Sequence, residues 1–264
     1  MKMYKYLKLT VVLLLVSCTA KQPIVENNTQ NTDAATDFTI AFGSCNRQTI
    51  ENKLWPAVLE QKPDLWIWGG DIIYADTKDM QKMANDYKLL KDQPHYQTLV
   101  KSSKILGTWD DHDYGLNDAG EEYEMKVESQ ALFLDFFNVP QNHARRNQEG
   151  VYHSEVFKTS EGSVKIIVLD TRYFRSPLTK STVNNRRYQP NKYGEGTILG
   201  ETQWQWLQEE LINSKANFNV IVSSIQVLSG EHQFEKWANF PHETERLLKL
   251  IENTKPNATF VISG

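Results

Sequence analysis

Side chains able to bind metal ions follow three successive apolar runs of this sequence. Cys45 comes after the first run, Asp71 and Tyr74 after the second, and the acids and histidine of residues 110–113 after the third. Because the carboxyl ends of strands share one rim of an α/β sheet, we expect these groups to converge. Clustered carboxylates without matching cationic side chains raise one another's pKa unless a cation lies between them, so the pattern predicts a metal site. Thiolate and phenolate ligands suit iron, and carboxylate oxygens suit calcium or magnesium.

Each of these residues also has an ordinary interpretation. Cys45 could be a small buried hydrophobe, or a nucleophile paired with a distant His112. Asp71 follows two glycines and could cap a helix, Tyr74 could be a rim aromatic, and residues 110–113 could form a solvated acidic turn. A thiol hydrolase, however, leaves unexplained why Asp71 and Tyr74 share the intervening strand end.

Alternating short apolar runs and amphipathic segments supply the elements that position these groups. Strands are expected at Phe38–Phe42, Leu65–Trp68, Lys104–Trp109, Val164–Leu169, Asn219–Ile225 and Ala258–Ile262. Helices are expected at Glu51–Gln61, Asp79–Lys91, His95–Ser102, Glu121–Phe137, Glu201–Asn213 and His242–Glu252. The alternation predicts an α/β domain whose sheets are covered by helices, with a meander-like patch around Val151–Leu169 and a long loop over 179–200.

Composition limits the classes of protein that this chain can be. The sequence has 264 residues, 40% of them hydrophobic, which supports a sizeable core and excludes a disordered or fibrous chain. With 29 basic and 33 acidic residues the formal charge is -4, so we expect no nucleic-acid-binding surface. Residues 38–264 show no internal repeat or low-complexity block and are expected to form one domain.

The first residues have the character of an export signal. Lys2, Lys5 and Lys8 precede the apolar run Leu9–Val16, which is too short to span a bilayer. The run Leu15–Cys18 resembles the lipobox of bacterial lipoproteins. We therefore expect residues 1–17 to be a signal peptide, Cys18 to carry a lipid, and residues 18–37 to be a disordered tether. This predicts an exported bacterial lipoprotein, membrane-anchored on the periplasmic or extracellular side.

Four sequence segments together resemble a known enzyme family. They are Phe42–Cys45, Gly70-Asp71-x-x-Tyr74, Thr108–Asp113 and Leu169–Arg175. In this order they are similar to the PhoD-like alkaline phosphatases, a branch of the calcineurin-like metallophosphoesterases, over about residues 38–264.

The resemblance implies a four-layer αββα sandwich that hydrolyses phosphomonoesters and phosphodiesters by attack of metal-activated water, with Fe(3+) and Ca(2+) as the expected metals and other divalent ions possible. It implies that Cys45, Asp71, Tyr74 and Asp111 bind metal, with Asp110 as a further ligand. It also implies that His112 donates a proton or contacts the phosphate.

Two arginines after the fourth strand have a role in the same chemistry. We expect Arg172 to hold a phosphate oxygen in a forked contact, with Arg175 in reserve; alternatively Arg172 simply pairs with Asp170 or another acid. Gln226, beyond the fifth strand, could shape the substrate pocket or belong to a structural loop.

The sequence departs from the family pattern at two places. The first strand lacks the Asp-x-His pair of the common dinuclear enzymes, which favours the cysteine variant of the site. The family continues beyond Gly264 with an acidic residue and a histidine, so the chain is expected to be truncated at its C-terminal side. A non-catalytic lipoprotein that binds metal or another ligand therefore remains the alternative to an enzyme.

Overall fold

The structure is a computed structural model that describes residues 38–264. The expected signal peptide, the expected lipidation site Cys18 and the expected tether all lie outside the described residues. The first sheet is parallel, in the order β1-β2-β3, with β1 at Ile40–Gly43, β2 at Leu65–Gly69 and β3 at Lys104–Thr108.

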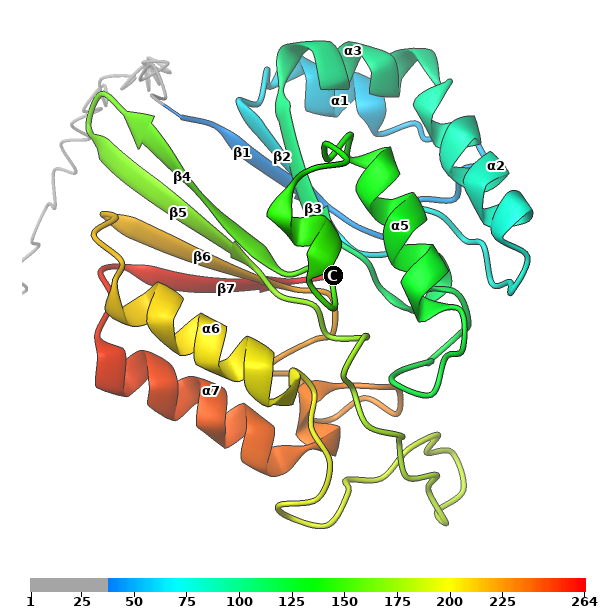
Figure 1. Cartoon of the computed structure of the whole chain (residues 1–264), viewed down its shortest axis with the longest axis vertical. Helices are drawn as coiled ribbons and strands as arrows, with labels where there is room; N and C mark the ends of the chain where they lie inside the picture. Colours follow the sequence, from blue (N-terminus) through cyan, green and yellow to red (C-terminus); the bar gives the residue numbers. More distant parts are fainter. Residues whose placement is uncertain (1–37) are drawn as a thin grey trace, which may run out of the picture. The chain divides into compact units, whose positions relative to one another are not determined.

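A second sheet has the order β4-β5-β6-β7 (Figure 1). Its strands are β4 (His153–Thr159), β5 (Gly162–Val168), β6 (Phe218–Ser223) and β7 (Thr259–Ser263). Strands β4 and β5 pair antiparallel, which confirms the meander-like patch, and the remaining pairs are parallel.

Helices cover the outer face of each sheet (Figure 1). The first sheet carries α1 (Trp55–Glu60), α2 (Met80–Lys91), α3 (Pro94–Ser102) and α5 (Lys126–Phe136). The second carries α6 (Gly200–Ile212) and α7 (Pro241–Thr254). The short helices are α4 (Asp111–Tyr114), η1 (Ala144–Asn147) and η2 (Trp237–Asn239).

Alternation along the buried strands explains why the layers stack in this way. Successive side chains of a strand point to opposite faces. In β2, Leu65 and Ile67 join the apolar layer between the two sheets, while Trp66 and Trp68 pack with the helices on the outer side. The second sheet repeats the pattern: Ile166 faces the other sheet and Ile167 packs with the cluster around α6 and α7. The predicted four-layer αββα sandwich is therefore confirmed.

The helices differ from expectation mainly at their first turns. Helix α1 begins at Trp55 instead of Glu51, with Pro56 in its first turn, where the missing N–H of proline costs no hydrogen bond. Helix α5 begins at Lys126 instead of Glu121. None of the helices within residues 38–264 is long and apolar enough to cross a bilayer.

Candidate metal centre and its cavity

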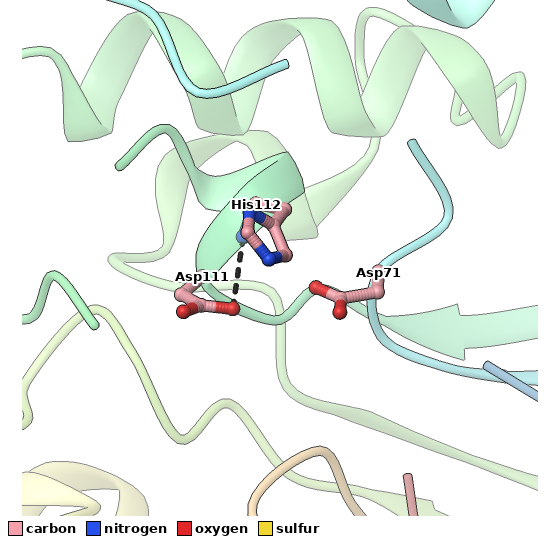
Figure 2. Close-up of side chains that lie close together, drawn as sticks. All are labelled: Asp71, Asp111 and His112. Atoms are coloured by element: carbon pink, nitrogen blue, oxygen red, sulfur yellow. Dashed lines mark hydrogen bonds between the residues drawn. The ribbon is translucent and has the colours of Figure 1, made fainter. Parts of the chain in front are cut away.

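Three of the predicted residues meet where β2 and β3 end. Ligand atoms of Asp71, Asp111 and His112 all lie within 4.8 Å of one another. Figure 2 shows the three side chains grouped around one space, with the backbone N–H of His112 donating to Oδ1 of Asp111 at 3.0 Å. Asp71 belongs to the loop after β2, and the other two residues open helix α4. The convergence expected from parallel strands is thus observed for these groups.

Cys45 and Tyr74 lie beside this group. The thiol of Cys45 is 3.6 Å from Oδ2 of Asp71, and both residues line the same cavity as Tyr74. The tyrosine ring also packs on the imidazole of His112, with ring centroids 4.1 Å apart. The loop carrying Cys45 is tied to the loop after β2 because Asn46 donates its backbone N–H to the carbonyl of Asp71 at 2.8 Å.

The backbone is strained where the ligands are presented. Cys45 and Asp71 have positive φ values of 57° and 51°, a region that side chains other than glycine seldom adopt. Gly70, with φ of 101°, is needed because a Cβ there would lie 2.6 Å from Cβ of Asp110 and 2.9 Å from Cβ of Ser224. Such strain, of order 1 kcal/mol or more per residue, gathers at functional sites. Asp71 does not begin a helix, so the capping alternative is excluded; α2 is capped by Asp79.

The electrostatics of the cluster favour a cation. Burial and the charge of Asp111 raise the pKa of Asp71 to about 6. Burial and the Asp71 carboxylate also raise the pKa of both Tyr74 and Cys45. For Asp111, burial acts to raise the pKa, but the Arg172 guanidinium and the backbone N–H of Asp118 outweigh it and lower the pKa.

One atom of the cluster tests whether a metal ion fits. The carboxylate oxygen Oδ1 of Asp71 is buried and has no hydrogen-bond partner among the described residues. A buried anionic oxygen left without a partner is costly unless a cation binds it. Together with the thiol, phenol, carboxylate and imidazole donors nearby, this orphaned oxygen shows that the residues present fit a metal ion.

His112 is oriented by an acid that the sequence did not single out. Its Nδ1 lies 2.7 Å from both carboxylate oxygens of Asp76, so Nδ1 carries a proton and donates it to that carboxylate. Burial acts to lower the pKa of His112, but the hydrogen bond to Asp76 and the charges of Asp111 and Asp71 outweigh it and raise the pKa. The imidazole is therefore held in one orientation beside the carboxylates.

Arg172 and Asp110 form a buried ion pair in the cavity wall. Nη2 of Arg172 lies 2.5 Å from Oδ1 of Asp110, and Nη1 lies 2.6 Å from Oε2 of Glu235. From Arg172, Asp170 accepts the backbone N–H alone, so the arginine side chain pairs with other acids and not with Asp170. Arg175 also pairs with Glu235, at 2.9 Å. Arg172 lines the cavity, whereas Arg175 lies behind it.

Two further buried acids position this machinery. Asp113 accepts the backbone N–H of Asp110 at 2.6 Å and that of Ile72 at 3.0 Å, which joins the loops after β2 and β3. Asp170 accepts the indole N–H of Trp109 at 2.9 Å in addition to backbone N–H groups. The short acidic run 110–113 was the only sequence signal for Asp113, and it is not a solvated turn because Asp113 is fully buried.

The cavity has a volume of about 790 Å³ and extends from the acidic cluster to the loops after β6 and before α6. Gln226 lines this cavity, in line with the alternative that it shapes the substrate pocket. Asp118, Arg187, His232 and Glu235 also line it, and none of these four was predicted as a site residue. They sit in irregular loops, where no periodic pattern indicates which side chains turn inward.

Comparison with known proteins identifies phosphatases as similar in sequence and in structure. The chain is 22% identical to alkaline phosphatase D of Bacillus subtilis (strain 168) over 265 residues, which cover 86% of this chain and 45% of the relative. A solved structure described as "Structure of PhoD" superposes with a TM-score of 0.66 at 21% identity, covering 86% of this chain and 50% of the other. A dimetal phosphatase from Danio rerio superposes with a TM-score of 0.55 at 14% identity, covering 86% and 81%.

These likenesses support the four-layer fold, although the chain spans only about half the length of the PhoD relatives it matches. The family model described as "PhoD-like phosphatase" matches residues 40–264, nearly all of the described part. The chain therefore belongs to the PhoD-like phosphatase family.

Proposed function

We propose that this chain is a metal-dependent phosphoric ester hydrolase that cleaves phosphomonoesters or phosphodiesters by attack of an activated water. The observation that carries the proposal is the meeting of Asp71, Asp111 and His112 within 4.8 Å, next to the thiol of Cys45. Family membership and the orphaned buried oxygen of Asp71 support it.

The proposed metal ligands are Cys45, Asp71, Tyr74 and Asp111. We assign iron(III) and calcium to the site because a thiol and a phenol suit iron while carboxylates suit calcium, and other divalent ions are possible. Asp110 is a weaker candidate because Arg172 already occupies one of its oxygens. When bound, the ions would neutralise phosphate charge and make a water molecule nucleophilic near neutral pH.

His112 is proposed to protonate the leaving alkoxide. Its Nδ1 is engaged with Asp76, which leaves Nε2 as the atom able to hand over a proton. A carboxylate behind an imidazole fixes its tautomer and orientation and stabilises the charged ring. A positioned proton transfer of this kind contributes about a hundredfold or more to the rate.

Arg172 is proposed to contact a phosphate oxygen. The guanidinium has five N–H groups. Contacts with Asp110, Glu235 and the carbonyl of Ala119 engage Nε, both N–H groups of Nη1, and one of Nη2. One N–H of Nη2 is left for substrate. Because the side chain is only 2% exposed, it is rigid, which favours it as a fixed donor at the cavity wall. Arg175, held behind the wall, would act by supporting Glu235.

The place of action is proposed to be outside the cytoplasm. The basic and apolar leader and the cysteine at its end support export and lipidation of Cys18. Labelling cells with a radioactive fatty acid, and comparing the chain with a Cys18→Ala variant, tests the anchor. Equal labelling of the unaltered chain and the Cys18→Ala variant would refute lipidation of Cys18.

Metal analysis and turnover assays test the enzymatic proposal. The purified chain should contain metal and hydrolyse p-nitrophenyl phosphate or bis-p-nitrophenyl phosphate, and a chelator should abolish both properties. Asp71→Asn should lower bound metal and turnover together, whereas Asp92→Asn, on an exposed surface, should change neither. Metal without turnover would instead support a binding protein. Turnover that survives the chelator but is lost on thiol alkylation would support a thiol hydrolase.

A further inference from the structure

The cavity has a second cationic side chain besides Arg172. Arg187 lines it from the long loop between β5 and α6, and its side chain is 47% exposed. Within residues 38–264 its one ion pair joins Nη2 to Oδ2 of Asp118 at 2.8 Å. Of its five N–H groups, this contact engages one, so the others are free to bind an anion.

The loop holds Arg187 in place by its backbone. The N–H of Arg187 donates to the carbonyl of Gln233 at 3.2 Å, and its own carbonyl accepts from Ser181 at 3.2 Å. A bridge between Lys180 and Tyr188 closes this part of the loop. The guanidinium is therefore presented to the cavity from a fixed backbone, and only its side chain has freedom to adjust.

Arg187 lies close to the candidate metal centre. The backbone N–H of Asp118 donates to Oδ2 of Asp111 at 2.6 Å, and the side chain of the same aspartate holds Arg187. These contacts and the span of one aspartate place the guanidinium within roughly 9 Å of the Asp111 carboxylate. If a phosphate binds at the metal centre, a second anionic group a few bonds away on the same substrate can therefore reach Arg187.

A second unused donor lies in the same wall. His232 accepts the backbone N–H of Phe234 with Nδ1 at 3.2 Å, so a neutral ring carries its proton on Nε2. That Nε2 is buried and has no hydrogen-bond partner within residues 38–264. Burial and the nearby Lys236 lower the pKa of His232, which keeps the ring neutral and Nε2 a donor. Phe234, 61% exposed, adds an apolar surface beside it.

We propose that Arg187 determines substrate specificity by binding a second anionic group, a phosphate on the leaving alcohol, with His232 as a neutral donor beside it. The preferred substrates would be esters of alcohols that carry another phosphate a few bonds from the scissile one. This inference rests on the proposed phosphoesterase function. It concerns the part of the cavity beside Asp118, which links Arg187 to Asp111 of the acidic cluster.

A matched pair of substrates measures this preference. Release of inorganic phosphate is followed for propane-1,3-diol monophosphate and for propane-1,3-diol bisphosphate, with the metal-loaded full chain. We expect Arg187→Gln to lower the ratio of kcat/KM, bisphosphate over monophosphate, by about tenfold, mainly through KM, since a charge-assisted hydrogen bond is lost. Arg187→Lys keeps the positive charge but not the paired N–H groups of the guanidinium, so it should lower this ratio by less than Arg187→Gln does.

The neighbouring Arg186 supplies the control. It is exposed, belongs to the same loop and does not line the cavity, so Arg186→Gln should leave the ratio as in the unaltered chain. If Arg187 only holds Asp118 in place, Arg187→Gln should lower kcat/KM equally for the monophosphate and the bisphosphate. An unchanged ratio in that variant would overturn the proposal.

A binding measurement separates this inference from the proposed enzymatic activity. Dissociation constants of propylphosphonate and propane-1,3-bisphosphonate are determined by calorimetry, and neither compound is hydrolysed. Arg187→Gln should weaken the bisphosphonate selectively by about tenfold. If the unaltered chain shows no turnover but Arg187→Gln still weakens the bisphosphonate selectively, the enzymatic proposal is refuted and the second anion site is retained. If Arg187→Gln weakens both compounds equally, the second anion site is refuted.

Discussion

Glu235 should be a main determinant of stability around the cavity. Its carboxylate, 7% exposed, pairs with Arg172 at 2.6 Å and with Arg175 at 2.9 Å, and those side chains are only 2% and 1% exposed. Glu235→Gln keeps the size of the side chain and removes its charge. Arg172 then retains Asp110, but in the described part of the chain Arg175 retains only backbone carbonyl partners, so one buried cation is left without a carboxylate.

The expected loss follows from that buried charge. Removing one partner of a buried ion pair typically costs 3–5 kcal/mol, and the amide oxygen left in place recovers part of it, so we expect a fall of about 3 kcal/mol in the free energy of unfolding. For a domain of this size that corresponds to roughly 9 °C in melting temperature. Urea unfolding of the metal-free chain measures the change directly.

Two comparisons make this experiment decisive. Glu231→Gln alters an exposed acid in the same segment and should change stability by less than about 0.5 kcal/mol. Combining Glu235→Gln with Arg175→Met removes the uncompensated cation, so the double variant should lose less than the sum of the two single losses. If Glu235→Gln is as stable as Glu231→Gln, the buried ion pairs do not carry the stability assigned to them.

Three further changes test other parts of the structure. Asp76→Asn removes the carboxylate behind His112 and should lower kcat for p-nitrophenyl phosphate by at least about tenfold with the circular dichroism spectrum unchanged; an unaltered kcat would mean that the imidazole needs no such support. Cys45→Ser should lower the iron bound per chain, measured by mass spectrometry, because a hydroxyl is a poorer iron ligand than a thiolate, and equal iron content would exclude the thiol as a ligand. Burial and the nearby Arg145 lower the pKa of His153 from 6.5 to about 3, so unfolded chains bind more protons at this residue between these values. The contribution of His153 to the free energy of unfolding should therefore fall by about 2 kcal/mol from pH 6.5 to 4.5, and in urea titrations the unaltered chain should lose about that much more stability over this range than His153→Gln; equal pH dependence of the two would refute the assignment.

Most of the fold could be predicted because buried strands have a strong sequence signature. Leu65–Gly69 is buried at every position, and such continuous apolar runs are typical of strands covered on both faces. The helix boundaries were less accurate. Residues 121–125 have helical composition, but the backbone N–H of Glu121 donates to the carbonyl of Arg175, a contact distant in sequence that no local pattern reveals.

The candidate site was predictable to the extent that strand ends position it. Cys45, Asp71 and Asp111 stand within three residues of the ends of the neighbouring parallel strands β1, β2 and β3, so knowledge of the sheet order suffices to bring them together. Asp118, Arg187 and Glu235 stand in loops whose paths depend on the whole tertiary structure. Their sequence neighbourhoods, rich in Asn, Arg and Gly or in exposed polar residues, are those of ordinary surface loops.

The buried acids show why residue type alone could not separate ligands from supports. Asp110, Asp111 and Asp113 stand within four residues, yet the first pairs with Arg172, the second faces Asp71 and the third accepts two backbone N–H groups. The turn of helix α4 makes the difference, because it sends successive carboxylates in different directions. Both oxygens of Asp113 accept backbone N–H groups and the residue does not line the cavity, so it acts as a support, whereas Asp71 lines the cavity and keeps a buried oxygen without a partner among the described residues. Asp111 also accepts two backbone N–H groups, but it lines the cavity within reach of Asp71. Position at the cavity together with hydrogen-bond satisfaction, both revealed only by the folded structure, therefore separates the carboxylates proposed to bind metal from those that support the loops.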